Sequence, residues 1–144
     1  MAIWEGGLAT HLRQPGAPRP RTDMPGALGG GASAPSPGWY FRAGMASCMA
    51  TSIALEAALH GIELTRLEVE AHSESDARGM LGSADVPSAP LRFWLKVSVE
   101  SPHASEAALR ALVAAADAHS PMVEAVRRPV AVEIDLQLRA VPGA

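Results

Sequence analysis

The sequence predicts an α+β fold in which antiparallel sheets carry the helices and one long helix lies buried at the centre. Three segments alternate apolar and polar residues, which is typical of strands that turn one face to a core and the other to solvent. Another run, from Pro37 to about His60, is apolar on every side, as in a helix enclosed by other structure. Helices separate the second alternating segment from the third, and this order favours helices laid on a sheet.

Residues 1–37 divide into two parts. The stretch from Ile3 to Leu12 predicts a first strand. Residues 14–36 are dense in proline and glycine, which predicts loops or an extended arm with little regular structure. At 144 residues the whole chain fits one domain that includes this arm.

The central helix has clear start and stop signals. Ser36 is able to cap free amide groups, and Pro37 suits the first helical position. Gly61 is a typical C-terminal stop after His60. Because a chain of this size cannot easily enclose a helix of that length by itself, we expect a second copy to help cover it.

The remaining elements follow from period-two alternation and from serine caps. The strands are expected at residues 67–72, 91–100 and 130–139. A helix is expected from near Ser101-Pro102, with Leu109, Leu112, Val113 and Ala116 on its apolar face. Ser120-Pro121 opens a shorter helix that runs through about Val126.

Composition excludes several classes of function. A net charge of −3 and a pI of about 5.9 leave no basic surface for nucleic acid or an anionic membrane. A single cysteine, Cys48, rules out a disulfide scaffold and suits a reducing cytoplasm, and no signal peptide is expected. The apolar run from Ala43 to Leu59 is short for a membrane span and contains Glu56. The histidines lack metal-ligand spacing with one another or with Cys48, so no metal is expected. No cofactor is expected either.

The order of elements, with the cysteine on the long helix and a serine-proline at a later helix start, resembles the OsmC/Ohr family of osmotically inducible and organic hydroperoxide resistance proteins. The resemblance runs from about residue 23 to the C-terminus. The residues that carry it are Asp23-Met-Pro25, Gly29-Gly30, Ala34-Pro-Ser-Pro37, Ala43-Gly-Met-Ala-Ser-Cys48, the segment Ile62–Val69 and His119-Ser-Pro-Met-Val123.

The resemblance implies an intertwined homodimer with the long helices side by side between two sheets. It also implies a thiol peroxidase for organic hydroperoxides. In such enzymes a first cysteine is oxidised to a sulfenic acid, and a second cysteine resolves it as a disulfide with help from a glutamate and an arginine.

Matched residue by residue, the family's catalytic set is incomplete. Cys48 falls on the peroxidatic position, whereas Ser120 falls on the resolving position and cannot form a disulfide. The family's glutamate falls at Gly38 or Trp39, so no carboxylate is there. Its N-terminal arginine has three candidates, namely Arg13, Arg19 and Arg21.

Each candidate residue also has a purely structural interpretation. Cys48 is either a reactive thiol or a small core residue. Ser120 is favoured as a helix N-cap, and the alternative is a hydroxyl that hydrogen-bonds a sulfenate at Cys48. Trp39, Arg42 and Met45 are expected to line a pocket at the thiol, although Trp39 with its aromatic neighbours also suits an anchor for the N-terminal arm.

Two polar residues near the ends of the helices stay open as well. Glu56, the lone acidic residue of the central helix, either reaches water, pairs with an arginine across a dimer, or replaces the missing acid. His119, next to Ser120, is expected to be structural, because adjacent residues point in different directions and no nucleophile elbow surrounds it.

Two functions are therefore expected. The first is an OsmC-like redox protein that uses Cys48 alone to reduce a small hydrophobic peroxide, with an external thiol as reductant. The second is a family relative that kept the fold and the dimer, lost peroxidase activity, and serves as a small-ligand binding or structural protein.

Overall fold

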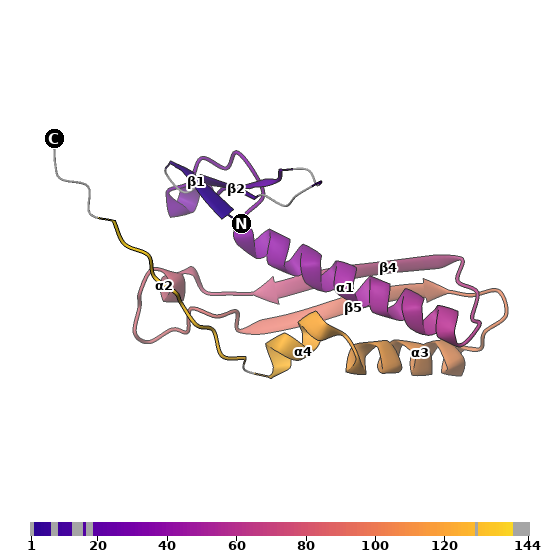
Figure 1. Ribbon diagram of the computed structural model, residues 1–144. Coiled ribbons are helices and arrows are strands. Elements are labelled where there is room, and N and C mark those ends of the chain that lie inside the picture. The colour runs from indigo at the N-terminus through magenta and orange to yellow at the C-terminus, as the bar shows by residue number, and fades with distance from the viewer. Residues whose placement is uncertain (1, 7–8, 13–15, 17–18, 129, 140–144) are drawn as a thin grey trace.

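The computed structural model describes residues 2–6, 9–12, 16, 19–128 and 130–139 (Figure 1). Two antiparallel sheets are present in this part of the chain, one of three strands and one of two. A long helix, α1 (Pro37–Leu59), lies along the two-stranded sheet (Figure 1). The α+β class and its antiparallel sheets are therefore confirmed.

The N-terminal segment is a hairpin rather than one strand. Strand β1 spans Ala2–Gly6, and β2 spans Ala9–Leu12 and pairs with it antiparallel. Strand β3, Arg21–Thr22, adds to the other edge of β2. The expectation of a single strand across residues 3–12 is wrong, because β1 ends at Gly6, which has φ +112°, a conformation that other residues rarely adopt, and Ala9 at the start of β2 pairs back with it.

Helix α1 spans Pro37–Leu59, which confirms the predicted start and stop. The Ser36 hydroxyl accepts a hydrogen bond from the Trp39 amide at 3.2 Å. One stripe of the helix is buried in the core, and its members are spaced four residues apart: Met45, Met49, Ile53 and Ala57. Another side is uncovered in the single chain, where Leu55 and Leu59 are 59% and 70% exposed.

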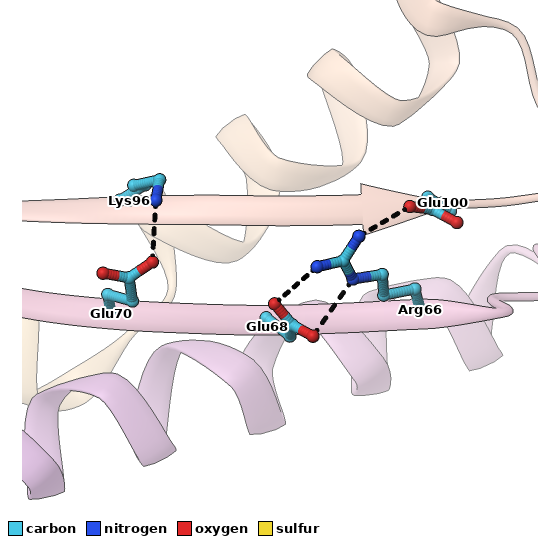
Figure 2. A network of polar contacts seen from close by, with 5 residues as sticks. All are labelled: Arg66, Glu68, Glu70, Lys96 and Glu100. Carbon is cyan, nitrogen blue, oxygen red and sulfur yellow. Dashed lines mark hydrogen bonds and ion pairs between the residues drawn. The ribbon is translucent and has the colours of Figure 1, made fainter.

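Strands β4, Arg66–Glu74, and β5, Arg92–Glu100, form the sheet beneath α1. Their predicted alternation is confirmed, and Val69 lies opposite Val97 on the face that packs against the core. The other face carries exposed charges (Figure 2): the Arg66 guanidinium bonds Glu68 and Glu100, and the Lys96 ammonium bonds Glu70 at 2.8 Å. The exposure of these side chains marks the solvent face of the sheet in the single chain. Exposed pairs of this kind contribute little to stability.

The shorter helices are η1 at Gly26–Leu28, α2 at Ala77–Met80, α3 at Glu106–Ala118 and α4 at Pro121–Arg127. Helix α3 begins later than predicted. Its cap is Ser105, whose hydroxyl accepts from the Ala108 amide, whereas Ser101 closes the turn before it by accepting from the Ala104 amide. No helix in the described part of the chain is long and apolar enough to cross a membrane.

The third predicted strand is wrong for the single chain. Residues 130–139 form no strand and extend away from α3 and α4 (Figure 1). Their alternating apolar side chains are strongly exposed, from 65% at Val130 to 86% at Val132. A strand needs a neighbouring edge for its backbone hydrogen bonds, and alternation of side chains does not supply one.

Asp23 organises the loop that leads into α1. Its carboxylate is buried and accepts hydrogen bonds from the amides of Met24, Gly31 and Ser33, and from the Ser33 hydroxyl at 2.7 Å. The backbone and side-chain hydrogen bonds from Ser33 are the main cause that lowers the pKa of Asp23 from 3.8 to about 2.

Replacing Asp23 with asparagine is expected to remove a pH-dependent part of the stability. Because the folded-state pKa is depressed, the carboxylate stabilises the fold fully above pH 3.8, and the contribution is lost as pH falls toward about 2. Urea unfolding should therefore show wild type more stable than Asp23→Asn near neutral pH, with the gap narrowing as pH drops below about 4. A gap that stays constant with pH would contradict this assignment.

Candidate functional site

The site is a contact between the central helix and the corner that joins α3 to α4. Helix α1 places Cys48, which is half-buried, two turns before Glu56. The corner places Ser120, which is fully buried. The Cys48 Sγ and Ser120 Oγ atoms lie 3.5 Å apart, within hydrogen-bond range for sulfur. Residues far apart in the sequence are thus brought face to face.

The Ser120 side chain does not cap α4, so the favoured interpretation of this residue is wrong. Ser120 occupies the N-cap position, and its carbonyl accepts from the Glu124 amide at 2.9 Å, but its hydroxyl makes no capping hydrogen bond. Pro121 at the first helical position has no amide hydrogen to offer. A fully buried hydroxyl needs a partner, and here the partner is the Cys48 sulfur.

Gly44, one turn before Cys48, lets the two helices approach closely. A Cβ atom at this position would lie 3.1 Å from the Met122 Cε and 3.4 Å from its Sδ, so a larger residue would push Met122 aside. Met122 follows Ser120 by two residues and packs against the core. Sequence reasoning missed this pair, although a glycine inside a helix, far from either end, is the signal of a close approach.

Glu56 lies between two histidines at the far end of α1. Its side chain is only 13% exposed, and its Oε1 atom is 3.3 Å from the Nδ1 atom of His119. Its Oε2 atom is 3.6 Å from the Nδ1 atom of His60, which also bonds the Glu56 backbone carbonyl at 2.9 Å. Of the three roles left open for Glu56, none included a histidine partner, because contacts between separate helices do not show in residue spacing.

The residues predicted to line a pocket lie in three different settings. Trp39 is 48% exposed and makes an edge contact with Tyr40, with ring centroids 5.1 Å apart. The Arg42 Nη1 atom donates to the Ser73 hydroxyl at 3.1 Å. Met45 is buried in the core and lines a groove of about 1080 Å³ that β5, α3 and α4 border.

The structure describes two of the three candidate arginines and both positions that match the family's glutamate. Arg19 is exposed, Arg21 lies in β3, and Arg13 lies outside the described residues. Gly38 and Trp39 are the first residues of α1 after Pro37 and bring no carboxylate. Among the described residues, no group of three or more His, Cys, Asp or Glu side chains is placed to hold a metal ion.

This geometry fits chemistry at one sulfur atom. When the thiol is ionised, the Ser120 hydroxyl donates to the thiolate; when the thiol is neutral, either atom can donate to the other. The same hydroxyl can hydrogen-bond an oxygen added to the sulfur. It cannot supply a second sulfur, so a disulfide within the chain is excluded.

The comparisons with known proteins agree with the fold. The model of a family described as OsmC-like protein matches residues 29–135. No curated protein matches the chain.

Solved structures of similar fold come from several bacteria. The organic hydroperoxide resistance protein OsmC of Legionella pneumophila is 24% identical, covers 88% of each chain and has a TM-score of 0.66. OhrB of Bacillus subtilis, an organic hydroperoxide resistance protein, is 22% identical over 95% of this chain and 96% of its own, with a TM-score of 0.60. An OsmC-like protein of Mycoplasma pneumoniae is 15% identical over 83% of this chain and 79% of its own, with a TM-score of 0.69.

Proposed function

Because this chain belongs to the OsmC-like protein family, we propose that it reduces organic hydroperoxides through Cys48 alone, with an external thiol as reductant. The family is related to organic hydroperoxide resistance and thiol redox chemistry. The observation that carries the proposal is the 3.5 Å contact between Cys48 Sγ and the buried Ser120 hydroxyl. Ser120 falls where a family peroxidase has its second thiol, so the position still faces the sulfur but has lost its redox role.

The first step oxidises the sulfur. The Cys48 thiolate attacks the distal oxygen of the hydroperoxide, the O–O bond breaks, and the alkoxide takes a proton and leaves as the alcohol. The sulfur becomes a sulfenic acid, and the Ser120 hydroxyl is placed to hydrogen-bond it. The thiolate form is required because the neutral thiol is a poor nucleophile.

The second step returns the sulfur to the thiol with two external thiols. One thiol attacks the sulfenic acid, expels water and forms a mixed disulfide with Cys48. The other attacks that disulfide, releases the oxidised reductant and regenerates the Cys48 thiol. A reducing compartment such as the cytoplasm supplies these thiols.

A homodimer is the second part of the proposal. Apolar side chains are exposed on the uncovered side of α1 and along residues 130–139, and an open groove lies beside β5, as is typical of a surface that another protein covers. A second copy covers such a surface symmetrically. This arrangement also satisfies the helix composition, which is apolar on every side.

Replacing Leu55 with lysine tests the dimer. Leu55 is 59% exposed in the single chain, so the change should spare the chain's own core, but it would bury an unpaired charge in the dimer. We expect the dimer dissociation constant to rise at least about ten-fold, measured by sedimentation velocity. Ala111→Lys, at an exposed position of α3 that does not line the groove, is the control and should leave the dimer intact. A monomeric wild type at micromolar concentration would overturn the proposal.

The absent carboxylate at Gly38 and Trp39 and the serine at position 120 favour one alternative, a family relative without peroxidase activity. Such a protein would be a homodimer with a small-ligand binding or structural role. Consumption of cumene hydroperoxide with dithiothreitol as reductant separates the two functions. A peroxidase consumes peroxide at a rate proportional to protein concentration. With the alternative, the rate of peroxide consumption is the same as in dithiothreitol without protein.

A further inference from the structure

We infer that Glu56 and His119 form a clasp that positions the Ser120 hydroxyl over the Cys48 sulfur. This inference deepens the proposed function, because it concerns the same site. Glu56 is on α1, the helix that carries Cys48, and His119 directly precedes Ser120 in the chain. The clasp therefore joins the two elements whose separation sets the distance between sulfur and hydroxyl.

The contact between the two side chains is a hydrogen bond with a fixed direction. An ionised carboxylate only accepts, so with Glu56 ionised the Nδ1–H group of His119 is the donor and the Glu56 Oε1 atom, 3.3 Å away, is the acceptor. The His119 side chain is 73% exposed, but the Glu56 side chain is only 13% exposed. The Glu56 carboxylate is thus largely buried on α1, and the exposed His119 side chain extends from the corner to contact it.

The backbone transmits this contact to the next residue. His119 is the C-cap of α3, and its amide donates to the Ala116 carbonyl at 3.3 Å. Ser120 follows as the N-cap residue of α4, so no flexible loop separates the clasp from the hydroxyl. Because one peptide bond joins the two residues, the hydrogen bond from His119 to Glu56 restrains movement of the corner, and of Ser120 with it, away from α1.

Other contacts share the Glu56 carboxylate or hold the same corner in place, so the clasp is not the only restraint on Ser120. His60 of α1 shares the Glu56 carboxylate at 3.6 Å, and at the same corner Asp117 of α3 bonds Arg127 of α4 at 2.9 Å. Close packing of Met122 at Gly44 also holds α4 on α1. Breaking the clasp should therefore lower the effective concentration of a side chain at position 120 near the Cys48 sulfur by a few-fold, without unfolding the site, because an exposed ion pair contributes little energy. Glu56 and His119 are positioning residues, because neither touches the sulfur.

A second thiol at position 120 measures the position directly. In Ser120→Cys, the equilibrium with glutathione gives the effective concentration of the introduced thiol at Cys48, and this readout does not require peroxidase activity. Adding His119→Ala should lower that effective concentration about three-fold. Adding His119→Asn should restore it, because the asparagine amide can donate a hydrogen bond from nearly the same place as Nδ1.

The matched control is Arg128→Ala, which breaks the Arg128–Glu124 ion pair within α4 and should change nothing at Cys48. Equal effective concentrations in the His119→Ala and Arg128→Ala backgrounds would overturn the clasp. So would equal losses in His119→Ala and His119→Asn, because only a donor at that place distinguishes them. If the protein had no peroxidase activity but the effective concentration still depended on His119, only the proposed function would be contradicted. The two failures are therefore distinguishable.

Discussion

Replacing Cys48 with serine is expected to reduce hydroperoxide consumption to the rate of the reductant alone. A serine hydroxyl has no oxidation step comparable to that of a thiolate, and no other cysteine exists in the chain to replace it. The measurement is loss of cumene hydroperoxide in the presence of dithiothreitol, at equal concentrations of folded protein. Thermal unfolding of the variant should stay close to wild type, because the substitution is small and the site is only half-buried.

Ser120→Ala separates the effect of losing the reactive sulfur from the effect of losing the hydrogen bond to it. The variant keeps Cys48 but removes its hydrogen-bond partner at 3.5 Å. A hydrogen bond to a charged group is worth about 1.5 kcal/mol or more, so the rate should fall about ten-fold and not to the background. Full activity in Cys48→Ser would show that the consumption comes from somewhere other than this thiol.

Replacing Ser120 with cysteine is expected to produce a disulfide to Cys48 on mild oxidation. The two side chains already face each other, and the positions are 72 residues apart in the sequence. Closing a loop of that length should stabilise the oxidised protein against unfolding by about 4 kcal/mol, less any strain in the bond. The measurement is the midpoint of urea unfolding, with and without reductant.

Wild type is the control for this stabilisation, since reductant should leave its unfolding midpoint unchanged. A Ser120→Cys protein that keeps two free thiols under oxidant would contradict the placement of the corner against α1. Dimers linked by disulfide between chains would contradict it as well, because the contact lies within one chain.

The sequence predicted the elements that depend on local signals. The caps and stops of α1 were correct because Ser36, Pro37 and Gly61 act on their immediate neighbours. The strands β4 and β5 were correct because each finds its partner in the other. Residues 130–139 have an equally regular alternation but pair with no strand among the described residues, and pattern alone does not show whether a partner strand is present.

The candidate site was predictable only in part. The match to family positions gave Cys48 and Ser120 as a pair, and the structure places them in contact. The direction of the Ser120 hydroxyl was wrongly expected, because a serine before a proline has the same sequence signature whether or not its side chain caps the helix. The contact of Glu56 with His119 depends on how α3 returns to α1, and residue spacing does not report that distance.

The central claim, that Cys48 is oxidised by an organic hydroperoxide and has no internal thiol to resolve it, is tested most directly by intact mass. Reduced wild-type protein is mixed with a small excess of cumene hydroperoxide in the presence of a sulfenic-acid trap, and the reaction is stopped within seconds. The account predicts one trapped adduct per chain, located at Cys48 and absent from Cys48→Ser. A chain that keeps its unmodified mass and a free thiol under these conditions would contradict it.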